Sequence, residues 1–282
     1  MTIQSILASP FLTSVVIRSL IVGMLVSLCS ALLGVSLVLK RYSMIGDGLS
    51  HVGFFALALC TAAGVAGAYT MEASIPIVVL AAVLILRLSR SKKIKGDAAC
   101  AIVSTGAVAI GTLINNILGV RSSDVCSSLF GSASLVTLTD KDLWLSVILS
   151  ALVLVWYVLC ARRIFAVTFD EPFARSAGVH TERLDMMMAI LTGITIVVGM
   201  KMMGAIMISA LILFPPMTAM RLTGSFRATV WVSGVVSVVS FVIGFVLACL
   251  FSLQTGATVV TVQLCVFLLF ALAGRVKVRS KK

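Results

Sequence analysis

The run Leu143-Trp-Leu-Ser-Val-Ile-Leu-Ser-Ala-Leu-Val-Leu-Val-Trp-Tyr-Val-Leu-Cys160 decides the fold class. It contains no charged residue, and its apolar side chains do not alternate with polar ones. A helix that crosses a membrane needs about 20 mainly apolar residues, whereas a strand of a membrane barrel shows alternation over about 10 residues. Trp231–Leu250 has the same character. The sequence therefore predicts membrane-spanning helices.

Composition extends this interpretation to the whole chain. Of 282 residues, 60% are hydrophobic and 11% are charged, and the mean hydropathy is +1.18. Soluble domains carry about 25% charged residues, so membrane lipid is the expected solvent. The net charge of +12 could indicate nucleic-acid binding. We expect none, because the basic residues flank the ends of the apolar runs.

Apolar runs separated by short polar segments predict an all-α polytopic membrane protein with one transmembrane domain over residues 1–282. We expect about nine spans, at 11–38, 44–68, 73–88, 97–118, 141–160, 184–200, 202–221, 228–250 and 256–274. The sixth and seventh need a tight turn near Lys201. A single broken helix there would reduce the number to eight.

Basic residues predict the orientation, because Lys and Arg concentrate in cytoplasmic loops. With nine spans, 18 of the 22 basic residues fall on the side of the loop Leu88–Gly96. We therefore expect a multi-pass protein of the plasma or inner membrane, with its N-terminus outside and its C-terminus in the cytoplasm.

Asp47 and His51 are the strongest candidates for a functional site. They open the second span, four residues apart, so they share one face of a helix about 6 Å apart along its axis. Ionisable residues in such a span are functional candidates by default, and a carboxylate with an imidazole can bind a divalent first-row metal. Gly46 and Gly48 would let a helix or a substrate approach closely.

A structural role for the same pair is an open alternative. Asp47 would then favour the positive end of the helix dipole, and His51 would be hydrogen-bonded to a neighbour. Two ligands are also too few for a tight metal site. Further ligands would have to come from other helices, a second subunit or water.

The expected cytoplasmic segment 162–185 contains a predicted short helix. Asp170 suits the N-cap, Glu171 and Pro172 suit the first turn, and Gly178 suits the stop. Phe169 and Phe173 give this segment an apolar side, so it could dock into a groove of a partner. The alternative is a solvated connector.

Three segments together resemble the ABC-3 family of metal permeases. They are Arg41-Tyr-Ser-Met-Ile-Gly-Asp-Gly-Leu-Ser-His51, which is similar to a G-D-x-x-S-H signature, Phe169-Asp-Glu-Pro-Phe-Ala-Arg-Ser-Ala-Gly178, and the stretch Val198–Ala219. Leu129-Phe-Gly-Ser132 also fits. The chain departs from the pattern at Val52-Gly-Phe-Phe55 and at Pro215-Pro-Met217. The first departure means that the resemblance does not define the shape of the pathway next to His51.

The resemblance implies the permease fold and subunit plan of an ATP-driven metal importer. It implies a homodimer, cytoplasmic ABC ATPase subunits and an extracytoplasmic metal-binding protein, with Asp47 and His51 contacting the metal in transit. Coupling to the ATPase would fall to Asp170, Glu171, Pro172, Phe173, Ala174, Arg175 and Gly178. No Gly is followed by Lys anywhere, so the phosphate-binding G-x-x-x-x-G-K-[ST] loop is absent.

We therefore expect a transport subunit and not an enzyme, with no permanently bound cofactor and with ATP used only through a partner. Zinc is the first choice of ion, because imidazole and carboxylate suit it, and manganese and iron are alternatives. A proton-driven secondary metal transporter is the main rival. Pro215 and Pro216 are expected to kink or end the seventh span.

Overall fold

The fold is all-helical over the residues that the computed structural model describes, 10–40, 42, 44–65, 69–90, 96–119 and 140–279. Its elements are α2 (Pro10–Leu39), α3 (Ile45–Ala62), α4 (Thr70–Arg90), α5 (Gly96–Ile117), α7 (Asp140–Phe169), α8 (Glu171–Ser176), α9 (Thr181–Met203), α10 (Ala205–Leu222), α11 (Phe226–Phe251) and α12 (Thr255–Arg279). No strand occurs in these residues. The predicted fold class is confirmed.

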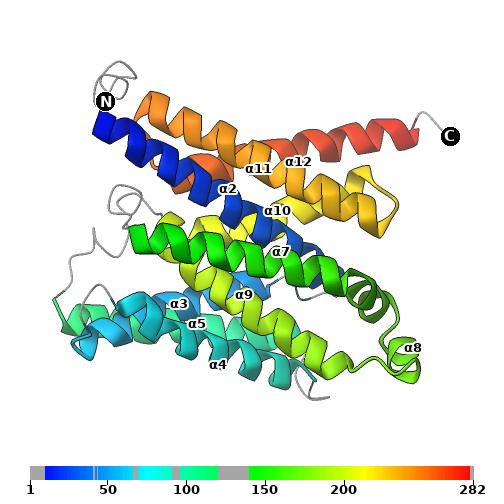
Figure 1. Ribbon diagram of the computed structural model, residues 1–282, viewed down its shortest axis with the longest axis horizontal. Helices are drawn as coiled ribbons and strands as arrows, with labels where there is room; N and C mark the ends of the chain where they lie inside the picture. The colour runs from blue at the N-terminus through cyan, green and yellow to red at the C-terminus, as the bar shows by residue number, and fades with distance from the viewer. Residues whose placement is uncertain are drawn as a thin grey trace.

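The long helices form one bundle and run between the same two ends of the molecule (Figure 1). Within the described residues, eight helices are long and apolar enough to cross a membrane, namely α2, α3, α5, α7, α9, α10, α11 and α12. The helix α4, of 21 residues, covers the predicted third span and lies alongside them. The start of α2 and the end of α12 lie at opposite ends of the bundle, as an odd number of spans requires.

The tight turn expected near Lys201 is present, and it lies at Gly204, between α9 and α10. Gly204 has φ +89° and ψ 156°, a conformation that is essentially restricted to glycine because a Cβ would clash. The chain reverses there, since α9 and α10 run in opposite directions in Figure 1. The alternative of one broken helix is therefore wrong.

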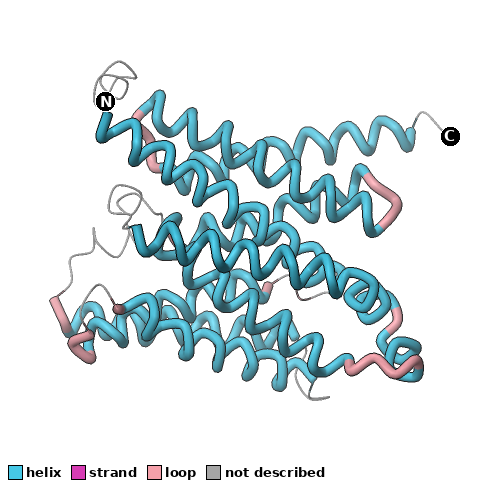
Figure 2. Tube along the Cα trace, in the orientation of Figure 1, coloured by secondary structure: helices cyan, strands magenta, loops and turns pink. Residues whose placement is uncertain are grey.

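The helix α7 continues beyond the predicted span, which ended at 160, to Phe169. Arg162 and Arg163 are exposed and point away from the bundle core, whereas Ile164 and Val167 are buried. This amphipathic extension keeps the chain helical outside the apolar run. The described loops, pink in Figure 2, are short, and the connection from α7 to α9 spans only residues 170–180.

The helix α2 lies at the centre of the bundle and packs on α7, α9, α10 and α11. One group of helices around it comprises α3, α4, α5 and α9, and the other comprises α10, α11 and α12. Small side chains let α2 approach its neighbours, and Ser27, Ser30 and Ser36 are fully buried. Small and hydroxyl residues are the usual contacts between membrane helices.

Candidate functional site

Asp47 and His51 occupy the first two turns of α3, on its accessible face. Their side chains are 53% and 24% exposed, and Asp47 Oδ1 lies 3.6 Å from His51 Nε2. This distance is longer than a hydrogen bond. His51 Nδ1 is buried and has no hydrogen-bond partner among the described residues. The alternative role, a histidine held by a neighbour's hydrogen bond, thus finds no support in this geometry.

The accessible face of α3 is a narrow stripe. Asp47, His51, Phe55 and Leu59 recur every four residues, and between Ile45 and Cys60 every other side chain except half-buried Leu57 is buried. The stripe therefore presents one carboxylate and one imidazole outward from a helix that is otherwise enclosed.

The buried side of α3 packs on the first turns of α5. A Cβ on Gly48 would lie 3.5 Å from the carbonyl oxygen of Cys100, which is ordinary van der Waals contact. No group of three or more His, Cys, Asp or Glu side chains suited to a metal ion occurs in the described part of the chain. The described residues of the same chain accordingly do not complete the pair of Asp47 and His51 with such side chains.

Gly46 brings α3 against α10. A Cβ on Gly46 would lie 3.1 Å from Ile212 Cγ2, a spacing tighter than normal side-chain packing. On α2, a Cβ on Gly34 would overlap the carbonyl oxygen of Ile212. Ile212 thus joins α10 to both α2 and the helix of the candidate site. Sequence reasoning missed Gly34 and Ile212, because neither carries a chemical group that marks it.

Pro215 and Pro216 are buried inside α10, which continues to Leu222. The expectation that they might end the span is therefore wrong. A proline lacks the N–H that would bond to the carbonyl four residues earlier, and its ring crowds that carbonyl. For Pro216 that carbonyl belongs to Ile212, which is the group against Gly34. Contact with Gly34 gives the freed oxygen a close neighbour on α2.

The predicted short helix is present as α8. Asp170 is its N-cap and accepts a hydrogen bond of 2.9 Å from the backbone N–H of Phe173, and Pro172 lies in the first turn. Arg175 pairs with Glu171 at 2.9 Å. Gly178 follows the helix with φ +82°, the left-handed stop that its position predicted.

The helix α8 has one buried side and one exposed side. Ala174 is buried, whereas Phe173 is 65% exposed, as is Phe169 before the helix at 61%. Phe169 also packs against Phe165 of α7 and Phe226 of α11, with ring centroids 4.9 and 6.2 Å apart. The exposed apolar surface of this segment is of the kind that docks into a partner.

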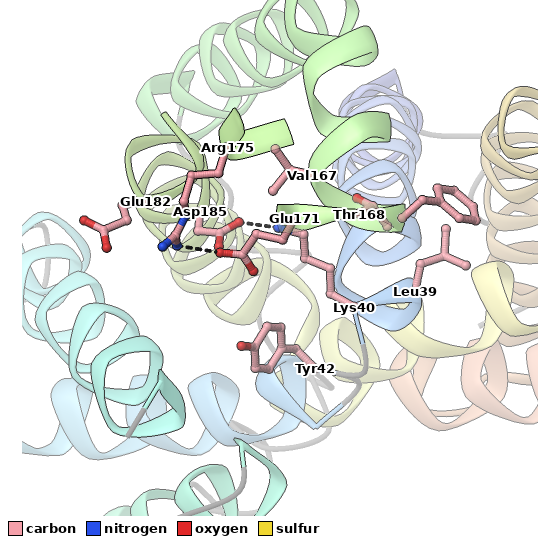
Figure 3. Close-up of a pocket in the computed structure, with 10 residues that line it drawn as sticks. Leu39, Lys40, Tyr42, Val167, Thr168, Glu171, Arg175, Glu182 and Asp185 are labelled. Atoms are coloured by element: carbon pink, nitrogen blue, oxygen red, sulfur yellow. Dashed lines mark hydrogen bonds and ion pairs between the residues drawn. The ribbon is translucent and has the colours of Figure 1, made fainter. Parts of the chain in front are cut away.

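A polar cavity of about 570 Å³ lies between α8, the start of α9 and the chain that follows α2. Its lining includes two ion pairs, Glu171 with Arg175 and Lys40 with Asp185 (Figure 3). Lys40 follows α2, and Asp185 lies in the first turns of α9; both side chains are 11% exposed. Sequence reasoning did not find this pair, because 145 residues separate its two members.

A model of the ABC 3 transport family matches residues 13–274. The chain belongs to this family. Its fold and its membership agree with the resemblance drawn from the three sequence segments. One of the supporting segments, Leu129–Ser132, lies outside the described residues.

Relatives of this ABC 3 transport family chain include membrane proteins of iron, manganese and zinc transport systems. A probable iron transport system membrane protein of Haemophilus influenzae is 29% identical over 93% of this chain and 94% of its own length. A manganese transport system membrane protein MntC of Halalkalibacterium halodurans is 26% identical over 89% and 85%. A high-affinity zinc uptake system membrane protein ZnuB of Haemophilus influenzae is 26% identical over 89% and 94%.

Solved structures show the same fold. A chain of PsaBC from Streptococcus pneumoniae in complex with Fab aligns with a TM-score of 0.79 at 23% identity, over 95% of this chain and 93% of that chain. A putative metal-chelate type ABC transporter in an inward-facing conformation aligns with a TM-score of 0.78 at 15% identity, over 94% and 89%. This ABC 3 transport family chain is therefore a multi-pass permease subunit of an ABC transporter and not an enzyme.

Proposed function

We propose that this permease conducts a divalent first-row transition metal into the cytoplasm, with zinc as the first choice, and that Asp47 and His51 contact the ion in transit. The observation that carries the proposal is the placement of both side chains on the accessible stripe of α3, 3.6 Å apart. Family membership supplies the transport context.

The stripe cannot face lipid at low cost. A charged side chain in the bilayer is expensive, so such residues face a protein interior or a water-filled cavity. Asp47 is 53% exposed in the single chain. We infer that a second copy of the chain covers this face and that the metal pathway runs beside it, which makes the working unit a homodimer.

The small number of ligands suits a transit site. A structural metal site uses four ligands, whereas conduction needs binding weak enough to allow release. His51 Nδ1 has no hydrogen-bond partner among the described residues, so no such bond fixes the orientation of the ring. Water and groups of the second copy would supply the remaining ligands.

Zinc is preferred because a neutral imidazole and a carboxylate are both good ligands for it. The same ligands also bind manganese and iron. The names of the relatives include iron, manganese and zinc transport proteins, so each of these ions belongs in the test. The ion is the cargo of the protein and not its cofactor.

We assign ATPase coupling to Asp170, Glu171, Pro172, Phe173, Ala174, Arg175 and Gly178. The exposed Phe173 on a capped helix supports this assignment, since a short rigid element transmits displacement better than a loop. Cytoplasmic ABC ATPase subunits would supply the energy, and an extracytoplasmic metal-binding protein would deliver the ion. The basic end of the bundle, with α8 and the C-terminus, would face the cytoplasm of a plasma-membrane transporter.

Gly46, Gly48, Pro215 and Pro216 remain pathway and hinge candidates in this proposal. Gly46 supports it through its tight contact with Ile212, four residues before Pro216. Bending of α10 at the prolines would therefore displace the start of α3.

The test is uptake of radioactive zinc, manganese and iron in cells that lack their own importers. The cells express this chain with its ATPase and binding protein. Asp47→Ala and His51→Ala should each abolish uptake at unchanged protein level. His180→Ala is the matched control, because His180 is the other histidine of the chain and is exposed before α9.

Two results would reject parts of the proposal. Normal uptake in both variants would remove Asp47 and His51 from the pathway. Uptake that persists with a catalytically dead ATPase, and follows the proton gradient, would favour the proton-driven secondary transporter instead.

A further inference from the structure

A groove lies between α7 and α11, and α2 forms its floor. Both helices pack on α2 but hardly on each other, and Figure 1 shows them on either side of it. The groove has a volume of about 590 Å³, within the range of sites that hold small ligands. Its walls and floor include Leu32 of α2, Leu154 of α7 and Val235 of α11.

The groove carries positive charge at one end only. Arg227 is the one charged side chain in its lining, and Trp231 lies one helical turn further along α11. Arg227 is exposed, and no ion pair involves it among the described residues. On α7, Ala161 lines the same groove and is followed directly by Arg162 and Arg163.

We propose that this groove is a binding site for one anionic phospholipid. An acyl chain of the lipid would lie along the valine and leucine side chains, and the phosphate of the headgroup would pair with Arg227. A phospholipid is charged at one end and apolar along the rest, which matches the groove. Basic pockets between transmembrane helices are a known form of site for anionic headgroups.

Trp231 supports this placement of the headgroup. It is 77% exposed, and tryptophan is enriched where a membrane meets water because its ring is both apolar and a hydrogen-bond donor. Arg227 lies one turn nearer the start of α11 and therefore at headgroup level. A protein segment in the groove would have to pair with a single arginine at one end of an apolar surface. No acidic side chain lines the groove among the described residues.

The bound lipid would touch the segment that leads to α8. Phe226 lines the groove, and its ring packs edge-on against Phe165 of α7 at 5.4 Å. The same cluster contains Phe169, which directly precedes the N-cap of α8. Occupancy of the groove would thus stabilise the contact between α7 and α11 beside α8.

Native mass spectrometry of the complete transporter tests the site. The complex, with its ATPase, is extracted in mild detergent from membranes that contain phosphatidylethanolamine and phosphatidylglycerol. The intact protein should retain phosphatidylglycerol above its share of the membrane. Arg227→Gln should lower this occupancy about fivefold, as expected for loss of one basic group near a membrane surface, and Arg227→Lys should retain most of it.

Matched variants separate the groove from general effects. Val235→Trp would fill the groove and should reduce retention to background, whereas Val246→Trp, on an exposed face of α11 outside the groove lining, should not. Arg221→Gln controls for loss of charge, because Arg221 lies at the same end of the bundle against Phe267 of α12. Retention in proportion to membrane composition, or equal retention in Arg227→Gln, would overturn the proposal. A disulfide between two copies carrying Val235→Cys would also overturn it, since a second copy would then occupy the groove.

Discussion

The carbonyl oxygen of Ile212 on α10 faces Gly34 on α2 at a position that a Cβ would occupy. Pro216 explains why this oxygen is available, because residue 216 would otherwise donate its N–H to Ile212 within the helix. The side chain of Ile212 meanwhile contacts Gly46 of α3. One residue therefore connects the prolines of α10, the central helix and the start of the candidate metal helix.

Replacement of Gly34 by alanine should destabilise the bundle strongly. The added Cβ would meet backbone and not a flexible side chain, so α2 and α10 would have to separate. We expect a loss of about 2–3 kcal/mol, in the range for overpacked cores. Thermal unfolding of the detergent-purified permease measures it.

Gly106→Ala of α5 is the control for Gly34→Ala. A Cβ at Gly106 would have no atom within 4 Å, and alanine favours a helix over glycine by about 1 kcal/mol. Stability should be unchanged or slightly higher. Equal losses of stability in the two variants would show that the close approach of α2 and α10 does not cause the loss in Gly34→Ala.

Pro216→Ala should stabilise α10 while slowing transport. The alanine N–H would be free to bond to the Ile212 carbonyl, and a proline inside a helix costs about 3 kcal/mol. If the prolines act as a hinge, a straighter α10 will no longer move α3, so metal uptake should fall several-fold while the melting temperature rises. Unchanged uptake together with a higher melting temperature would make the prolines structural only.

Loss of the ion pair between Lys40 and Asp185 should cost more than loss of the pair on α8. Both side chains of the first pair are 11% exposed, and removing one partner leaves the other charge poorly solvated, at a cost of about 3 kcal/mol. Glu171 and Arg175 are 43% and 60% exposed, so their pair contributes about 0.5 kcal/mol. Thermal unfolding of Lys40→Met and Arg175→Met compares the two.

The reversed pair provides the decisive control for Lys40 and Asp185. Lys40→Asp combined with Asp185→Lys should recover part of the stability that each single change removes. Additive losses in the double variant would mean that the two residues act independently. The pair connects the segment before α3 to α9, beside α8. We therefore expect metal uptake to rank the single and double variants in the same order as their stability.

Asp170→Ala should weaken coupling more than folding. Removal of the N-cap frees the N–H of Phe173 and destabilises α8 by about 1 kcal/mol, which is small for the whole bundle but large for a helix of 6 residues. In the complete transporter reconstituted into liposomes, ATP hydrolysis should continue while metal transported per ATP falls. Asp170→Ser keeps a cap and should retain coupling, and a fall as large as that of alanine would argue against capping as the cause.

The sequence by itself determined the solvent, the class of structure and the local geometry of several segments. Only helices and closed barrels satisfy their backbone groups in lipid, and long uncharged runs such as Leu143–Cys160 lack the alternation of barrel strands, so the apolar pattern was sufficient. Asp170 and Gly178 specified the ends of α8, because capping depends on residues that are neighbours in the chain. The shared face of Asp47 and His51 followed from helix periodicity in the same way.

Only the tertiary structure decided which distant residues meet. The contact of Gly34 with Ile212 and the pair of Lys40 with Asp185 depend on how α2 crosses α10 and α9. Glycine and isoleucine recur throughout such a chain, so nothing local distinguishes the residues in contact from the rest. The exact position of the break, at Gly204, and the extension of α7 to Phe169 had the same origin. The apolar pattern does not specify these two helix boundaries, and packing and backbone sterics decided both.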